Sequence, residues 1–148
     1  MNNRHQIAGV FSAMEVAASG LTAERGRLNL IASNLANART TRGADGNPYR
    51  RIDPVFVARS SHPNSFDPVL RQIQEVKLTG TRTDETPGQL VYDPTHPDAN
   101  PRGYVEYPNV SVVSEMVNLM TASRAYEAGV TSIESIKSMA RSALKIGQ

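Results

Sequence analysis

The chain contains no cysteine among its 148 residues, which excludes a disulfide framework and any thiolate metal site. Lysine is also scarce, because only Lys77, Lys137 and Lys145 contribute to a basic total that is otherwise arginine. The planar guanidinium of arginine suits fixed ion pairs better than the lysine ammonium, which favours protein interfaces. The net charge of +2 is far from the basic excess of a nucleic-acid binder, so we expect no nucleic-acid partner.

Long apolar runs are missing as well. None approaches the ~20 residues that a membrane span needs, so we expect no transmembrane segment. The start, Met1 to Gln6, lacks the apolar stretch and cleavage site of a secretory signal, and we interpret it as polar and flexible. If the protein leaves the cytoplasm, we expect a route without a cleaved signal peptide.

Proline is absent from both ends of the chain. All nine prolines lie between Pro48 and Pro108. A proline inside a helix costs about 3 kcal/mol, so this distribution predicts two long helices around a turn-rich middle. We expect an α+β fold with long, antiparallel, coiled-coil-like terminal helices and a small inserted β/loop domain. The expected parts are an N-terminal helix over 1–41, an insert over 42–108 that faces outward, and a C-terminal helix over 109–148.

Apolar residues recur in steps of four and three along the N-terminal stretch, which is heptad spacing. This spacing predicts a helix from about Ile7 to Ala38. Small residues around Gly20 and Gly26 would let another backbone approach closely. The residues expected to form helix-pairing and subunit contacts here are Phe11, Met14, Leu21, Leu28, Ile31 and Leu35.

The C-terminal stretch repeats the spacing after two candidate N-cap residues, Asn109 and Ser111. Gly129 is a weak point inside this helix. Two seams of similar length predict an antiparallel pair whose outer apolar residues are buried only when subunits pack together. The residues expected to contribute are Met116, Leu119, Tyr126, Val130, Ile133 and Leu144.

Two charged residues, Arg25 and Lys137, interrupt these apolar seams. Buried charges are normally paired. If the helices are antiparallel with aligned midpoints, Lys137 lies near Glu15 and Arg25 near Glu127. The alternative is that Arg25 faces a water-filled channel.

The middle of the chain is rich in turn residues, beginning with a strong turn signal at 44–48. We expect a mobile loop over 58–68 and a connection near Thr86-Pro87-Gly88. The expected strands are Tyr49 to Val57, interrupted at Asp53-Pro54, and then Glu75 to Arg82, Gln89 to Tyr92 and Tyr104 to Tyr107.

The sequence carries no pattern that indicates catalysis. Asp93, His96 and Asp98 could form a metal cluster, but the prolines between them favour a turn. Arg50 and Arg51 could mark an acidic partner, but a solvated strand end is the favoured interpretation. There is no nucleophile elbow and no glycine-rich phosphate loop, so we expect no enzyme, cofactor or metal.

Residues 20–38 and 116–128 resemble the N-terminal and C-terminal signatures of flagellar rod and hook proteins. Residues 45–51, 103–110 and 145–148, together with the short middle, resemble the proximal-rod branch of that family. The chain departs from the family pattern at Ser111 and Gly129, which concerns local capping and helix continuity. The signature residues are Asn34, Asn37, Arg124 and Tyr126.

The resemblance implies a structural subunit of the bacterial flagellar basal body, located in the periplasmic rod. Such subunits stack helically, with the terminal helices as inner wall, into a drive shaft and export channel. The implied partners are copies of itself, other rod subunits, the adaptor to the membrane ring and the flagellar type III export apparatus. Another axial rod subunit is the nearest alternative. A helical-hairpin adaptor or export chaperone, which would be a compact folded dimer, is an alternative of another class.

Overall fold

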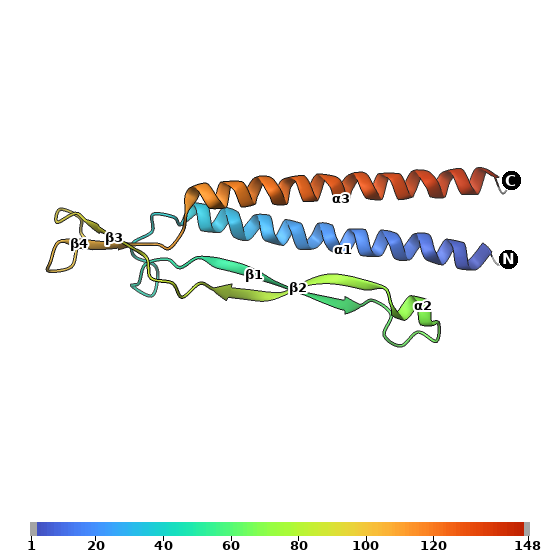
Figure 1. Cartoon of the computed structure of the whole chain (residues 1–148), viewed down its shortest axis with the longest axis horizontal. Coiled ribbons are helices and arrows are strands. Elements are labelled where there is room, and N and C mark those ends of the chain that lie inside the picture. Colours follow the sequence, from blue (N-terminus) through green and yellow to red (C-terminus); the bar gives the residue numbers. More distant parts are fainter. Residues whose placement is uncertain (1–2, 147–148) are drawn as a thin grey trace. The chain divides into compact units, whose positions relative to one another are not determined.

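The computed structural model describes residues 3–146 and shows a long helix near each end of the chain, with four strands and a short helix between them in the sequence (Figure 1). This arrangement confirms the α+β class. Within the described residues, no helix is long and apolar enough to cross a membrane. The elements are α1 (Asn3–Ala36), β1 (Ile52–Ser60), α2 (Pro68–Arg71), β2 (Gln74–Thr83), β3 (Gln89–Tyr92), β4 (Tyr104–Tyr107) and α3 (Val112–Ile146).

The described chain divides into two compact units. Residues 3–26, 56–79 and 122–146 form one, which we call the terminal unit. Residues 27–55 and 80–121 form the other, which we call the junction unit. Each unit therefore contains parts of both long helices and part of the middle segment. We predicted that the insert over 42–108 faces outward in an assembly, and this stays a prediction.

The strands form two separate two-stranded sheets, β1–β2 and β3–β4. β3 and β4 pair antiparallel, with Gln89 opposite Tyr107 and Tyr92 opposite Tyr104, and both strands have the predicted bounds. The strand ending at Thr83 and the strand beginning at Gln89 are joined near Pro87 as expected, but they lie in different sheets.

Two predictions for the first strand were wrong. β1 runs through Asp53-Pro54 without interruption, because a two-stranded sheet has only edge strands and an edge tolerates the missing N–H of proline. It also continues to Ser60, so the expected loop over 58–68 begins as strand and ends with the first residue of α2.

The helix ends differ from the prediction by a few residues. α1 begins at Asn3, four residues before the predicted start at Ile7, and Met1 and Asn2 lie outside the described residues. The flexible start stays a prediction. None of residues 3–6 is proline or glycine, so nothing there stops the helix. α1 ends at Ala36, where the Asn37 side-chain amide donates to the Ser33 carbonyl at 2.9 Å.

Ser111 is the N-cap of α3, because its Oγ accepts a hydrogen bond from the Ser114 backbone N at 3.4 Å. The Ser111 carbonyl also accepts the first helical bond, from the Glu115 N at 2.9 Å. The second candidate cap, Asn109, has a different role in the junction unit that is described below.

In the terminal unit, small residues of α1 lie against β2. The Ser19 Oγ accepts a hydrogen bond from the Val76 backbone N at 3.2 Å, and Ala23 is buried. A Cβ at Gly26 would lie 2.9 Å from Leu78 Cδ2. The expectation that small residues admit another backbone is confirmed for this face of the helix, and the backbone that approaches is β2.

α1 and α3 run antiparallel within the same unit (Figure 1), and they also meet through small residues. Ala122 is fully buried. A Cβ at Gly129 would lie 2.8 Å from Leu21 Cδ2, so the missing side chain makes room for the leucine. Gly129 weakens the helix locally but allows this close contact between helices.

Candidate functional site

A network of polar side chains lies inside the junction unit, and Asn34 of α1 is at its centre. The Asn34 side chain is 1% exposed. Its Oδ1 accepts hydrogen bonds from the Ile52 backbone N at 3.0 Å and from the Tyr49 hydroxyl at 2.8 Å. Its Nδ2 donates to the Ile52 carbonyl at 3.0 Å and to Glu115 Oε2 at 3.2 Å. Asn34 therefore joins the end of α1 to the start of β1 and to α3.

Glu115 of α3 is equally buried, at 1% exposed. Its Oε1 accepts a hydrogen bond from Arg51 Nε at 2.8 Å and another from Asn118 Nδ2 at 3.3 Å. The hydrogen bond to Glu115 raises the pKa of Arg51 above its ordinary value. Buried carboxylates need such partners, since a charge without them is costly in a protein interior.

The Arg51 guanidinium also forms a two-pronged pair with Asp53, in which both N–O distances are 2.8 Å. Bidentate pairs of this kind fix both direction and distance. Asp84 Oδ2 lies 3.9 Å from the same guanidinium. Arg51 is thus held by three carboxylates, and its interpretation as a solvated strand end was wrong. Arg50 fits that interpretation better, because it forms an exposed ion pair with Glu85.

Asn109 forms hydrogen bonds to two loop segments of the same unit. Its Oδ1 accepts a hydrogen bond from the Arg51 backbone N at 2.8 Å. Its Nδ2 donates to the Asp84 carbonyl at 3.1 Å and to the Thr86 carbonyl at 3.2 Å. Asn109 therefore satisfies backbone groups from two loops and does not cap α3.

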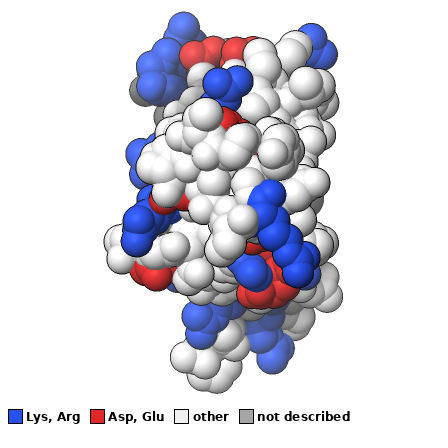
Figure 2. All heavy atoms as spheres, turned by 90° about the vertical axis from the view of Figure 1, so that its left-hand side faces the viewer, with Lys and Arg blue, Asp and Glu red and all other residues white. Residues whose placement is uncertain are grey.

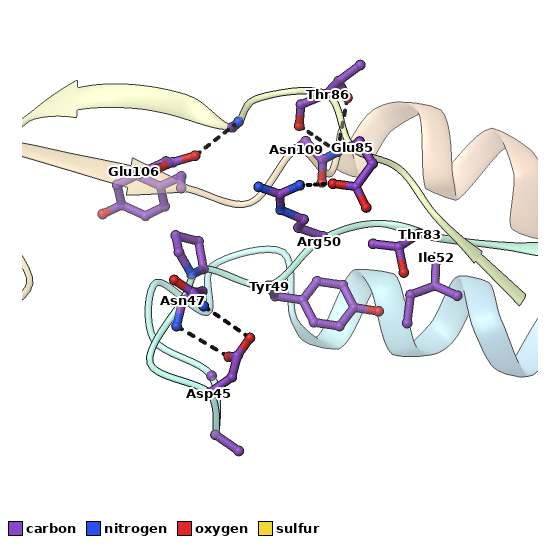
Figure 3. Close-up of a pocket in the computed structure, with 15 residues that line it drawn as sticks. Asp45, Asn47, Tyr49, Arg50, Ile52, Thr83, Glu85, Thr86, Glu106 and Asn109 are labelled. Atoms are coloured by element: carbon purple, nitrogen blue, oxygen red, sulfur yellow. Dashed lines mark hydrogen bonds and ion pairs between the residues drawn. The ribbon is translucent and has the colours of Figure 1, made fainter.

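A cavity of about 700 Å³ opens beside this network (Figure 3). The rings of Tyr49 and Tyr107 and the side chain of Ile52 give it apolar walls, and Arg50 and Glu85 lie on its rim. The residues over 44–48 form the expected turn along one side, in which the Asp45 carboxylate accepts hydrogen bonds from Asn47. These bonds hold the pKa of Asp45 below its ordinary value.

The segment between β3 and β4 forms the expected turn. Asp93 Oδ1 accepts hydrogen bonds from the backbone N and the hydroxyl of Thr95, which lowers the pKa of Asp93. Asp98 accepts from the Thr41 hydroxyl at 2.8 Å and lies 3.6 Å from Arg42. Within residues 3–146, no group of three histidine or acidic side chains is placed to hold a metal ion.

Two family models match the ends of the chain. "Flagella basal body rod protein" matches residues 14–44, and "Flagellar basal body rod FlgEFG protein C-terminal" matches residues 102–146. The flagellar basal-body rod protein FlgC of Borreliella burgdorferi is 45% identical to the chain, over 95% of the chain and 99% of that relative. The FlgC proteins of Bacillus subtilis and Escherichia coli are 41% and 42% identical, over 93% and 90% of the chain and 98% and 95% of each relative.

The chain belongs to the FlgC family of flagellar basal-body rod proteins. It is accordingly a structural rod subunit of the flagellar basal body. The network residue Asn34 lies inside a segment that the rod-protein model matches, and Glu115 lies inside the segment matched by the second model. Tyr49 and Arg51 lie between the two matched segments, where similarity is to FlgC proteins as a whole.

The signature residues of the FlgC chain have different environments. Asn34 is buried, and Asn37 accepts a hydrogen bond from the Thr40 hydroxyl at 3.3 Å. Tyr126 is half-buried, and Arg124 is exposed.

The expected contact residues divide by burial in the same way. Ile31 is buried within the chain. As helix-pairing and subunit contacts, all of these residues stay predictions. The half-buried ones are Met14, Leu21, Leu28, Leu35, Leu119, Tyr126 and Ile133, and the exposed ones are Phe11, Met116, Val130 and Leu144.

The two seam ion pairs stay predictions as well. In this FlgC chain, Glu15 Oε2 lies 4.0 Å from His62 Nε2. Arg25, Glu127 and Lys137 are exposed, so they are available to neighbouring subunits.

Sequence reasoning missed Glu115 and the role of Asn109. An acidic residue in the first turn of a helix is ordinarily explained by the helix dipole, and nothing local distinguishes Glu115 from that case. The available signal was the combination of Asn34 among the apolar residues near the end of α1 and Arg51 after the turn, since polar side chains need partners when they are buried.

Proposed function

We propose that the chain stacks helically with its copies and with other rod subunits to form the proximal rod. In this proposal the terminal helices line the inner wall and the residues over 42–108 face outward. The rod then acts as a drive shaft that transmits torque and as a channel for exported subunits. Adjacent partners are the adaptor to the membrane ring and the flagellar type III export apparatus, and the location is the periplasm.

The observation that carries this proposal is the apolar surface of α3 in the junction unit. Val113 is 74% exposed, and Met120 is 59% exposed. Contiguous exposed apolar residues mark interaction surfaces in proteins that otherwise bury them. A helical assembly would cover this surface with helices of neighbouring subunits. Its members are Val112, Val113, Met116, Val117 and Met120.

The charge distribution is consistent with protein contacts. On the face drawn in Figure 2, basic and acidic side chains of the described residues alternate, and they do not form a continuous basic stripe. Mixed charge of this kind favours specific pairing and register between proteins. It gives little attraction for a polyanion.

The test replaces the chromosomal gene with a Met120→Glu variant and images purified basal bodies. We expect the number of rods to fall at least about tenfold, because the variant puts a charge into a buried contact. Thr121→Glu, which adds the same charge at the adjacent exposed polar position, is the matched control and should be milder. Normal rods in a strain that lacks the gene altogether would contradict the proposed function.

Export is tested separately. If the chain leaves the cytoplasm through the type III apparatus, the periplasmic fraction of a strain without that apparatus should lack it. The amino terminus of the exported chain should be uncleaved by mass spectrometry. A periplasmic chain in that strain, or one shortened at its amino terminus, would contradict this part of the proposal.

A further inference from the structure

Phe66 is the most exposed large apolar side chain of the described residues. It is fully exposed, on a loop of the terminal unit between β1 and α2. The loop is held in shape by hydrogen bonds from the Ser65 backbone N to the His62 carbonyl at 3.2 Å and from the Asp67 backbone N to Ser65 Oγ at 3.1 Å. An aromatic ring presented on a loop with internal hydrogen bonds is a typical anchor for a pocket in a partner, because such bonds reduce the ordering that binding requires.

The cavity of the junction unit has the properties of such a pocket. Its volume of about 700 Å³ is ample for one aromatic ring, and Tyr49, Ile52 and Tyr107 supply apolar walls. Figure 3 shows the Tyr49 ring and the Ile52 side chain next to each other in this space. Aromatic pairs in offset or edge-to-face geometry are favourable beyond the area they bury.

The charges around the two features are opposite. The cavity is lined by three carboxylates, those of Asp45, Glu85 and Glu106, and by one basic side chain, Arg50. Residues 59–71 around Phe66 carry two arginines and one aspartate. Opposite charge of this kind orients two surfaces and raises the rate of encounter.

The positions of the Phe66 ring and of the cavity residues in the sequence also bear on which contact they form. Phe66, Tyr49 and Ile52 lie between the two segments that the family models match, 14–44 and 102–146. Contacts that other rod and hook proteins share are expected within the matched segments. A contact through residues 45–101 would instead be particular to FlgC proteins.

We infer that Phe66 of one copy inserts into the cavity lined by Tyr49, Ile52 and Tyr107 of a second copy. The ring and the cavity are different patches of the same chain, so the contact is head-to-tail. Such contacts leave one free ring and one free cavity at the ends of every oligomer, and they propagate as a helix when they do not close into a ring. The inference rests on the proposed helical stacking and assigns one specific contact to it.

The test places the photo-crosslinking amino acid p-benzoyl-phenylalanine at position 66 of the full chain, which keeps an aromatic ring there. Basal bodies are purified, irradiated and analysed by mass spectrometry. We expect a dimer of this chain, with the adduct on peptides that contain Tyr49, Ile52 or Tyr107. The same probe at Asn64, an exposed position on the same loop, is the matched control and should give little of this adduct.

Substitutions give a second and independent reading. Phe66→Ala removes the ring, and Thr83→Trp fills the cavity from an exposed residue on its wall. Each should lower incorporation into rods about tenfold, which is the lower end of the cost of losing a buried phenylalanine. The double variant should be no worse than either single one, since both remove the same contact. Circular dichroism of the isolated variants should match the parent chain, because Phe66 and Thr83 are both exposed.

Three results would overturn the inference: adducts within a single chain, adducts only on another rod protein, or additive losses in the double variant. These outcomes leave the proposed function intact, provided that the chain is present in the purified basal bodies. Absence of the unsubstituted chain from those basal bodies would instead contradict the proposed function.

Discussion

In the junction unit the most buried side chains include polar ones, whereas in the terminal unit the closest contacts involve the smallest side chains. Asn34 and Glu115 are each 1% exposed, and each has several hydrogen-bond partners. In the terminal unit Ala122 is fully buried, while Met139 and Leu144 of the same helix remain exposed. The junction unit satisfies its buried polar groups inside a single chain, and both units leave apolar residues of α3 exposed to water.

This difference indicates a division of labour. A fully satisfied buried polar network favours one arrangement over others, because every alternative leaves a polar group without a partner. Exposed apolar residues gain stability only when a neighbour covers them. We therefore expect the junction unit to fold in the isolated chain and the terminal unit to reach its full stability in the rod.

The largest effect is expected from Glu115→Ala. The substitution leaves Asn34 and Arg51 without their shared carboxylate, and the free energy of unfolding should fall by about 3 kcal/mol or more. Urea denaturation of the isolated chain measures this change. Glu85→Ala removes an exposed partner of Arg50 and should cost at most about 1 kcal/mol. Equal losses for the two variants would contradict the central role of the network.

Asn34→Asp should have the next largest effect. The new carboxylate cannot donate to the Ile52 carbonyl, and it places like charge beside Glu115, which lies 3.2 Å from the present amide nitrogen. The free energy of unfolding at neutral pH should fall by about 2 kcal/mol. Asn37→Asp, at a half-buried position just after the same helix, removes one donated bond, to the Ser33 carbonyl; it is the control and should cost less than half as much. A neutral Asn34→Asp would mean that this amide is not part of the framework.

Two glycines of the terminal unit give a smaller and sharper test. A Cβ at Gly20 meets nothing within 4 Å, so Gly20→Ala should raise the free energy of unfolding by about 0.5–1 kcal/mol. At Gly129 the same gain in helix stability is offset by a steric clash, because the new Cβ would lie 2.8 Å from Leu21 Cδ2. Thermal unfolding should show a higher midpoint for Gly20→Ala only. Equal gains would show that the helices are not in close contact at Gly129.

The smallest expected effect is on the stability of the chain at acidic pH. Hydrogen bonds from the backbone N and the hydroxyl of Thr86 lower the pKa of Asp84. The associated stabilisation is therefore complete above the ordinary aspartate pKa of about 3.9 and is lost as pH falls through the lowered value. Thr86→Val removes one of the bonds and brings the pKa of Asp84 closer to its ordinary value, so the loss of stability in acid should be smaller and should be complete at a higher pH. Identical acid transitions in the two chains would exclude this contribution.

Proline placement and apolar spacing are local properties, and they predicted the helices and the bounds of β3 and β4. Neither property indicates which distant segments of the chain pair with each other. The partners of Arg51 include Glu115, 64 residues away, and no local pattern connects the two. Glu115 itself was missed for the same reason.

Heptad spacing concerns large apolar residues, whereas the face of α1 that meets β2 includes Ser19 and Gly26. These residues are useful there because they are small. The small-residue patch was recognised from the sequence, but its partner could only come from the fold.

Hydrogen exchange tests the division between the two units most directly. It compares the isolated chain with the same chain in purified rods, and it reports local opening segment by segment. We predict that amides around Asn34, Ile52 and Glu115 are protected in both states. Amides of residues 130–146 should exchange quickly in the isolated chain and become protected in the rod. Equal protection of residues 130–146 in the two states would contradict the account.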